Sequence, residues 1–309
     1  MNEQLFEKDF LLTRVDFDRK NQPRLKLGDI NTSDIFTFTP QFEAPITLEI
    51  DLGDRYCIGW HDLKTGEDFL CPENSKIDKK YEQCPQCQKR TGFNPAFYNA
   101  ADGDISEQQI ERNSQPHFVY LAYFSDEVVK VGISFADRGN ARLLEQGARA
   151  ALILGEFSSA NVARSYEEKI SKMPEFCENV KASAKIKLLE QDFSFDRASN
   201  ILLTSKTRIE ERLKVKFDQN KPINLDNFYS LESKVPSGEI ILASDCQQNS
   251  NKIIFSGILK AQVGYILLAE QQHEIIAISL RKFTGYKIKI IPKITELELP
   301  ERQACLFNF

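Results

Sequence analysis

The sequence has no long run of apolar residues. Its longest apolar stretches, such as residues 263–269, are far shorter than the ~20 residues that a membrane-spanning helix requires. The first ten residues carry Glu3, Glu7 and Asp9 where a signal peptide requires positive charge and an apolar run. We therefore expect no membrane partner and predict a cytoplasmic protein.

The sequence also has no excess of positive charge. Forty basic residues stand against forty-five acidic ones, which gives a net charge of −5 and excludes a uniformly basic, histone-like DNA coat. A local basic face is still compatible with this charge. The chain is 41% hydrophobic and 28% charged, as in folded, soluble proteins, and 309 residues suffice for two domains or three small ones.

Changes of pattern along the chain predict an α+β protein with three folded parts. Short alternating segments before residue 50 indicate strands, and five short apolar segments after Pro222, separated by glycines, indicate a small sheet or barrel. The predicted parts are a β-rich region with a four-cysteine site (1–98), a linker with one short helix (99–116), an α/β core with extra helices (117–220), a C-terminal β domain (221–299) and an exposed tail (300–309).

The core has the clearest pattern. Residues 118–124 and 128–134 are aromatic and β-branched and predict a hairpin. A helix near residues 138–147, a strand over 149–157 and a helix over 160–172 follow, and two more helices are expected before Phe217. The predicted order is therefore ββαβα.

Four of the seven cysteines lie within 31 residues. Cys57, Cys71, Cys84 and Cys87 have the spacing C-x13-C-x12-C-x2-C, and the last pair forms a knuckle that directs two thiolates to one point. Disulfides are rare in the cytoplasm, so this cluster predicts a structural zinc site without an open coordination position. Two alternatives remain: a redox pair at Cys84 and Cys87, or His61 in place of one thiolate. The other three cysteines are expected to be ordinary apolar residues.

The segment HFVYLAYFSDEVVKVGIS resembles the GIY-YIG nuclease superfamily. The tripeptides that define the superfamily stand here as Val119-Tyr120-Leu121 and Lys130-Val131-Gly132, followed by helical Arg142 and Glu167. More narrowly, KVGIS, RLLEQGARAA, A-x-x-x-E-x-x-I and the later KFTGYKI are similar to an uncharacterised bacterial family that joins a cysteine-rich N-terminal part to a GIY-YIG-like core. This resemblance covers most of the chain and is strongest over residues 117–172.

The resemblance implies metal-dependent hydrolysis of phosphodiesters in DNA or RNA. Glu167 would bind one Mg²⁺ or Mn²⁺ ion, which keeps most of its waters, and Arg142 would clamp the phosphate. Tyr120 would position or deprotonate the attacking water, and Lys130 would add positive charge.

The chain departs from the superfamily pattern in several ways. Val131 stands where the superfamily usually carries a tyrosine, and its late asparagine has no counterpart. Arg138 competes with Arg142 for the role of the arginine, and Glu168 competes with Glu167 for the metal. A core that has lost its activity and serves as a nucleic-acid-binding adaptor is the second reading, and a protein-interaction scaffold is the third.

Two C-terminal segments carry further candidate residues. Residues 281–293 have five basic and no acidic residues, so Arg281, Lys282, Lys287 and Lys289 are candidate contacts for nucleic acid. The alternative is that these lysines protect an exposed strand edge. The tail resembles the short motif with which bacterial DNA enzymes bind the replication sliding clamp, through Gln303, Leu306 and Phe307. The alternative is that the tail folds back onto its own sheet.

Overall fold

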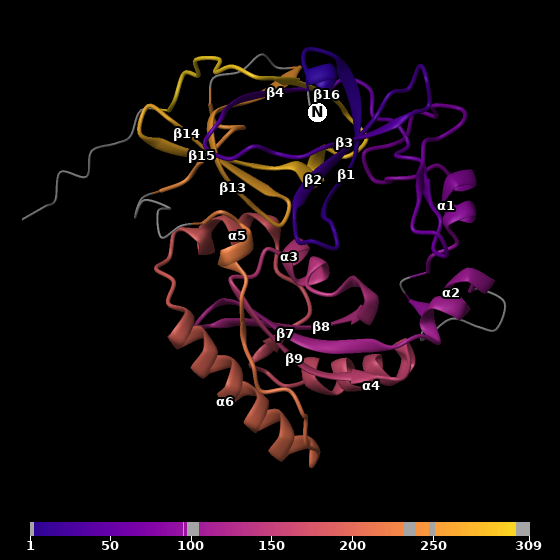
Figure 1. The fold of residues 1–309 in the computed structure, drawn as a ribbon, viewed down its shortest axis with the longest axis vertical. Coiled ribbons are helices and arrows are strands. Elements are labelled where there is room, and N and C mark those ends of the chain that lie inside the picture. The colour runs from indigo at the N-terminus through magenta and orange to yellow at the C-terminus, as the bar shows by residue number, and fades with distance from the viewer. Residues whose placement is uncertain (1–2, 95, 98–104, 232–238, 247–250, 301–309) are drawn as a thin grey trace, which may run out of the picture.

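A computed structural model describes residues 3–94, 96–97, 105–231, 239–246 and 251–300. The fold is mixed α+β, as the sequence predicts, and consists of two main sheets with helices between and around them (Figure 1). Within the described residues, no helix combines the length and the apolar character needed to cross a membrane.

The larger sheet has nine strands, drawn from both ends of the chain. Its order is β12-β15-β14-β13-β4-β16-β1-β2-β3. The N-terminal strands are β1 (Asp9–Phe17), β2 (Pro23–Gly28), β3 (Ile35–Phe38) and β4 (Pro45–Asp51). The C-terminal strands are β12 (Ile241–Leu242), β13 (Lys252–Val263), β14 (Ile266–Gln271), β15 (Glu274–Ser279) and β16 (Lys287–Ile291). The N-terminal and C-terminal β regions, which the linker and the α/β core separate in the sequence, therefore share one sheet.

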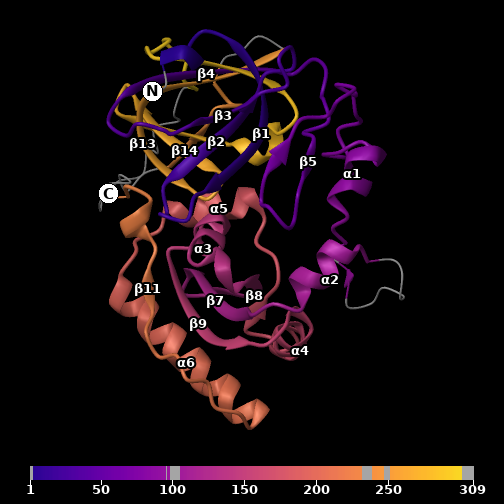
Figure 2. The same ribbon diagram turned by 45° about the vertical axis from the view of Figure 1, so that its right-hand side comes forward.

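This sheet curves around a single apolar core (Figures 1 and 2). Alternation along each strand directs every second side chain inward. In β16, Ile288 and Ile290 enter the core while the lysines on either side of Ile288 face outward. In β14, Leu267 and Ala269 join this core, whereas Leu268 packs on the opposite face against the second half of the molecule. Both faces of β14 are buried, which explains its nearly continuous apolar sequence.

The smaller sheet contains the predicted hairpin. Its order is β10-β8-β7-β9-β11, with β7 (His117–Ser125) between β8 (Val128–Phe135) and β9 (Ala150–Phe157). The short strands β10 (Phe176–Cys177) and β11 (Ile223–Asn224) lie at its edges. Helix α3 (Ala141–Gln146) follows β8, and α4 (Ala160–Ser171) follows β9, which confirms the predicted order of strand, strand, helix, strand, helix.

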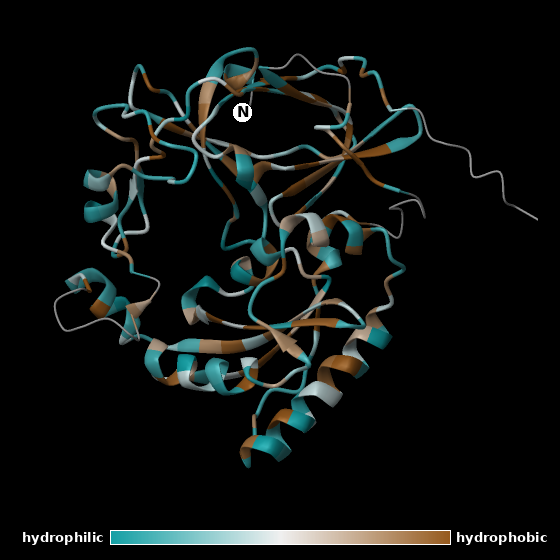
Figure 3. Ribbon diagram, turned by 180° about the vertical axis from the view of Figure 1, so that it is seen from behind, coloured by the Kyte–Doolittle hydropathy of each residue, from teal (hydrophilic) through white to brown (hydrophobic). Residues whose placement is uncertain are grey.

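The two faces of β7 face different layers. Tyr120 and Ala122 pack with α3 and α5 (Ala182–Leu189), which lie between the two sheets. Val119 and Leu121 pack with α4 and α6 (Phe195–Leu213) on the outer face. Figure 3 shows the result: hydrophobic colour gathers on the strands, and the helices alternate between hydrophobic and hydrophilic segments.

The remaining elements are short. β5 (Trp60–His61), β6 (Asp68–Phe69) and α1 (Pro85–Thr91) surround the cysteines, and α2 (Glu107–Asn113) is the helix predicted in the linker. The 3-10 helices are η1 (Glu3–Leu5), η3 (Ala136–Arg138), η4 (Asp226–Phe228) and η5 (Leu280–Phe283).

Candidate functional site

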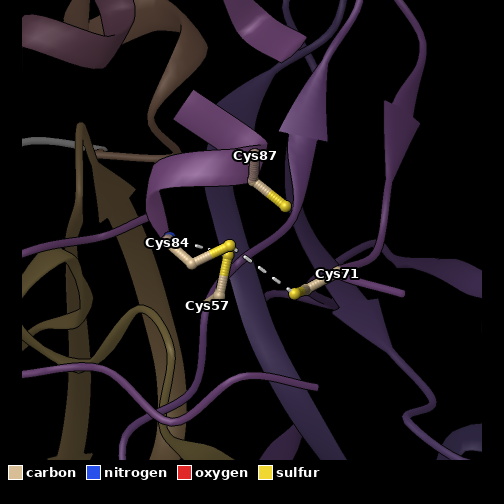
Figure 4. Close-up of side chains that lie close together, drawn as sticks. All are labelled: Cys57, Cys71, Cys84 and Cys87. Carbon is tan, nitrogen blue, oxygen red and sulfur yellow. Dashed lines mark hydrogen bonds between the residues drawn. The ribbon is translucent and has the colours of Figure 1, made fainter. Parts of the chain in front are cut away.

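The four clustered cysteines come together in one buried group (Figure 4). Cys84 is the N-cap of α1, and Cys87 lies in the first turn of this helix. Cys57 and Cys71 come from the loops before β5 and after β6. All four Sγ atoms lie within 4.8 Å of one another, although the first and last cysteines are 30 positions apart. The four cysteines whose spacing predicted a common site therefore do lie together.

The geometry of the cluster fits a tetrahedral metal. Zinc–sulfur bonds of ~2.3 Å place the sulfurs of a tetrahedral site about 3.8 Å apart. The Sγ atoms of Cys71 and Cys84 are 3.9 Å apart, and none of the four cysteines forms a disulfide. The backbone N–H groups of Gly59 and Cys84 donate to the Cys57 Sγ at 3.4 and 3.2 Å, as expected around a thiolate. The group could thus hold a structural metal such as zinc.

Three of the thiols have shifted pKa values. Burial raises the pKa of Cys57 to about 11 and also raises the pKa of Cys87. Burial raises the pKa of Cys71 as well, but hydrogen bonds with Ser75 outweigh this effect and lower the pKa to about 7. A metal that binds thiolates must therefore displace protons from Cys57 and Cys87.

The cluster organises a segment with little apolar material of its own. Among the described residues, Trp60 and Ile77 are the only other apolar side chains that pack against this small core. Arg55 links the segment to the turn before β16, because its guanidinium donates to the backbone carbonyls of Thr284 at 2.9 Å and Lys79 at 2.5 Å. A metal here would supply cohesion that the side chains alone do not.

The second candidate site begins at Tyr120, which is 1% exposed. Tyr120 pairs directly with Gly132 across the hairpin, so a side chain at position 132 would stand on the same face. A Cβ atom built there would lie 2.5 Å from the Tyr120 hydroxyl oxygen. Because Gly132 has no side chain, the Tyr120 phenol can lie across β8 at this position.

Charged side chains surround this phenol. Burial raises the pKa of Tyr120, the nearby Arg142 guanidinium lowers it, and the Glu167 carboxylate raises it. Lys130 pairs with Ala122 in β7 and so lies on the same face as Tyr120. Burial and then Arg142 lower the pKa of Lys130, while Glu167 acts in the opposite direction. Tyr120 and Lys130 are thus each within electrostatic reach of both Arg142 and Glu167; we call these four residues, which the resemblance names, the tyrosine site.

Glu167 reaches this site from the other side of the sheet. Its helix, α4, packs on the outer face of β7 and β8 through Ala163 and Ile170. Strand β10 pairs only with Val129 and Lys130, so the rest of β8 is an edge within the described sheet. Burial raises the pKa of Glu167, and Arg164, whose Nη1 lies 2.5 Å from Glu167 Oε2, opposes this effect.

The structure separates the competing residues. Glu168 is exposed, and Lys172 donates to its carboxylate at 2.7 Å, so it faces solvent while Glu167 is buried. Arg138 is bound to Glu145 on one side of α3, and it acts on Tyr120 less strongly than Arg142 does. Glu167 and Arg142 are therefore the members of each pair that belong to the tyrosine site.

Val131 does not face the tyrosine site. Its side chain is fully buried in the outer core, on the face opposite Tyr120. The residue beside Tyr120 on its own face is Lys130. A second group acting with the phenol would thus stand at position 130, because successive strand residues point to opposite faces.

Sequence reasoning missed two residues near the tyrosine site. Lys185 of α5 and Tyr265, in the turn between β13 and β14, both interact electrostatically with Arg142. Nothing in the local sequence distinguishes them, since they approach Arg142 only when the two sheets pack together.

The four basic C-terminal candidates separate into two pairs. Arg281 and Lys282 are exposed in η5. Lys287 and Lys289 lie in β16, which is flanked by β4 and β1, so the proposal that they protect a sheet edge is wrong. Asp51 and Glu49 stand opposite them in β4, and Lys289 Nζ lies 3.7 Å from Asp9 Oδ1. These acidic neighbours reduce the positive charge available to nucleic acid. The tail residues Gln303, Leu306 and Phe307 lie outside the described residues.

Comparison with known proteins gives one match. No curated protein and no solved structure matches the chain. A family model described as "Protein of unknown function (DUF2797)" matches residues 46–288, which include the cysteine cluster, the tyrosine site and most of both sheets. Because this match covers well over half of the sequence, the chain belongs to the DUF2797 family.

Proposed function

We propose that this protein hydrolyses phosphodiester bonds of DNA or RNA at the tyrosine site, through a GIY-YIG-like core and with the help of a divalent metal ion. The observation that carries the proposal is the grouping of a buried tyrosine with an arginine, a lysine and a glutamate around a strand glycine. These residue types supply the functions that phosphodiester hydrolysis needs: charge neutralisation, a group that orients water and a carboxylate for a cation.

Each residue has a distinct role in this proposal. The planar guanidinium of Arg142 binds two phosphate oxygens, and Lys130 adds charge from the adjacent strand. The Tyr120 hydroxyl orients the attacking water. Glu167 offers one carboxylate to Mg²⁺ or Mn²⁺, and such an ion would activate the water and neutralise the phosphate. A single carboxylate is a sufficient protein contribution for Mg²⁺, which retains several waters.

One observation favours the second candidate function, a nucleic-acid-binding adaptor without activity. Arg164 Nη1 lies 2.5 Å from Glu167 Oε2, so a guanidinium already occupies one side of the carboxylate that would bind the metal. Binding a cation requires this ion pair to loosen. In the adaptor, Arg164 would replace the metal permanently, and the other basic residues would still bind phosphate.

Cleavage assays separate the two functions. Purified full-length protein is incubated with labelled single-stranded, nicked and branched DNA and RNA, with Mg²⁺, with Mn²⁺ and without added metal. We expect metal-dependent cleavage that Glu167→Gln abolishes while nucleic-acid binding is retained or strengthened. The matched control is Glu168→Gln, which changes the neighbouring glutamate that faces solvent. This variant should cleave like the wild-type protein.

The variant Arg142→Ala should weaken both binding and cleavage, since it removes a charged contact worth ~1.5–3 kcal/mol. Binding without cleavage under every metal condition would favour the adaptor. The absence of salt-dependent binding would refute both functions and leave the protein-interaction scaffold.

A further inference from the structure

Four cationic side chains from both halves of the molecule gather around α3; we call Lys130, Arg142, Lys185 and Arg281 the basic cluster. Lys185 lies within electrostatic reach of the other three. Lys130 is buried, Arg142 and Lys185 are half-buried, and Arg281 is exposed. The cluster therefore leads from solvent to the side of Tyr120.

Specific contacts fix the two residues that lie outside the core hairpin. Lys185 Nζ donates to the Gln146 carbonyl at 2.5 Å and lies 5.2 Å from the centre of the Phe124 ring. The Arg281 guanidinium lies 5.1 Å from the centre of the Tyr265 ring. The lysine is thus held at the end of α3, and the arginine is held on an aromatic platform.

The turn between β13 and β14 brings this platform to α3. Gly264 has a φ of +61°, and a Cβ atom at this position would lie 2.9 Å from the Glu145 carbonyl oxygen and from the Gly147 nitrogen. Only glycine permits so close an approach. As a consequence Tyr265, the next residue, acts on Arg142: burial lowers the pKa of that guanidinium, but Tyr120, Glu145 and Tyr265 together raise it above its usual value.

The basic cluster has few acidic partners. Within the described part of the chain, no carboxylate lies within ion-pair distance of Lys185, Lys130 or Arg281, and Glu145 is shared between Arg142 and Arg138. Burial, together with the other three cations, lowers the pKa of Lys185 to about 8. Four cations with a single shared carboxylate, Glu145, at ion-pair distance are expected to attract an anion with several negative oxygens.

We propose that Lys185 and Arg281, together with Arg142, bind a phosphate of the nucleic-acid strand next to the one at the tyrosine site. This inference rests on the proposed function. The inference adds that the half of the molecule that contains the large sheet supplies part of the site, through Arg281 of η5. The substrate strand would then run between the two halves of the molecule and past η5. The alternative role for Lys185 is purely structural, as a cap for the carbonyl groups at the end of α3.

Binding measurements on the full-length protein test this inference without relying on cleavage. A fluorescently labelled 20-nucleotide single strand is titrated without added divalent metal, at several salt concentrations. Lys185→Gln and Arg281→Gln should each weaken binding roughly tenfold, as expected for a charged contact. Each should also reduce the slope of log affinity against log salt by about 0.7. Lys187→Gln on α5, an exposed lysine outside the basic cluster, is the matched control and should bind like the wild type.

The pH dependence provides an independent readout. A group with a pKa of about 8 is charged at pH 7 and neutral at pH 9, so wild-type affinity should fall over this interval, and the fall should be smaller in Lys185→Gln. The charged groups facing Lys185 are Lys130 from β8, Arg142 from α3 and Arg281 from η5.

The possible outcomes distinguish this inference from the nuclease proposal. Wild-type affinity in both variants would overturn the subsite even if the protein cleaves, and a loss of thermal stability alone in Lys185→Gln would assign that residue to capping. If both variants bind more weakly but the protein never cleaves, the second phosphate site is supported and the nuclease proposal is refuted.

Arg281 is exposed, so Arg281→Gln should fold normally. Its binding therefore tests the inference even if Lys185→Gln is unstable. A mononucleotide is also compared with an unlabelled strand as a competitor of the labelled strand. If both displace it equally well, the site does not recognise a strand, and the inference is overturned.

Discussion

The position of the Tyr120 phenol depends on an absent side chain. Gly132 stands opposite Tyr120 in the hairpin, and the hydroxyl oxygen occupies the space where a Cβ atom would lie. Glycine in a strand normally costs stability, because it has more conformational freedom to lose on folding. Gly132 should therefore lower the stability of β8, but it makes room for Tyr120, the central residue of the candidate site.

Gly132→Ala should therefore displace the phenol. We expect a loss of stability of about 1–3 kcal/mol, as for overpacked cores, and a loss of any cleavage activity. Urea unfolding and the cleavage assay measure the two effects. Gly155→Ala in β9 is the control, since its Cβ atom would meet nothing closer than 3.7 Å and its stability should stay within about 1 kcal/mol of the wild type. Equal stability of the two variants would contradict this account.

The cysteine cluster leads to a second prediction for single residues. Purified protein should contain about one zinc ion per chain, and Cys87→Ser should lower both the zinc content and the melting temperature, because binding energy in such a site is folding energy. Elemental analysis and thermal unfolding provide the measurements. Cys177→Ser, outside the cluster, should keep its zinc. Soluble wild-type protein without zinc, prepared without chelators, would refute the prediction.

At the scale of elements, Glu210 anchors the end of α6 to the loop that follows it. Its carboxylate accepts from the backbone N–H of Phe217 at 2.7 Å and lies 2.8 Å from Lys206 Nζ and 3.3 Å from Lys216 Nζ. The hydrogen bond from Lys206, followed by that from Phe217, lowers the pKa of Glu210 to about 2. The ionised form is therefore the form that stabilises this end of the helix.

The direction of the pH effect follows from this shift. The native pKa lies below the unfolded value of about 4.3, so the contribution is complete above about pH 5 and disappears as the pH falls towards 2. Glu210→Gln should be less stable than the wild type at pH 7, and this difference should shrink at pH 3. Denaturant unfolding at both pH values measures it. Glu211→Gln, its exposed neighbour, should show no such difference, and a constant deficit in Glu210→Gln would contradict the assignment.

Local patterns were sufficient to predict most of the elements. The aromatic and β-branched content of residues 118–134 predicted the hairpin. The helix predicted over 160–172 is α4, which Ser159 caps by accepting a hydrogen bond from the Val162 N–H. The cysteine partners followed from spacing, because a tetrahedral site demands four nearby thiolates. By contrast, Lys185 and Tyr265 carry no local signal. They join the site only through packing between distant segments, which no short pattern encodes.

At the scale of the whole molecule, one sheet unites the two ends of the chain. β4 lies between β13 and β16, and β16 lies between β4 and β1. Sequence patterns identified the strands on both sides of the core but gave no indication of their pairing, because an alternating strand can pair with any strand of matching character. Register depends on long-range contacts that the sequence order does not reveal.

This arrangement predicts that the N-terminal region is not an independent domain. A fragment of residues 1–98 lacks β13 and β16, so it would expose Leu48 and Ile50 of β4, which are fully buried in the complete protein. We expect the fragment to unfold without cooperativity, even with zinc added, and to aggregate. Circular dichroism and calorimetry measure the thermal unfolding of the fragment, with the full-length protein as the comparison. A sharp, reversible transition in the fragment would show that its strands suffice.

The central place of β16 also sets an order of events during synthesis. The edges of β1 and β4 that it joins leave the ribosome more than 230 residues before β16 does. At about 5–20 residues per second, the nascent chain carries these open edges for roughly 10–50 seconds. The hairpin of β7 and β8, with its helices, is complete well within this interval. The large sheet is therefore completed beside an α/β core that has already been synthesised, and the basic cluster forms as one of the last features of the newly made protein.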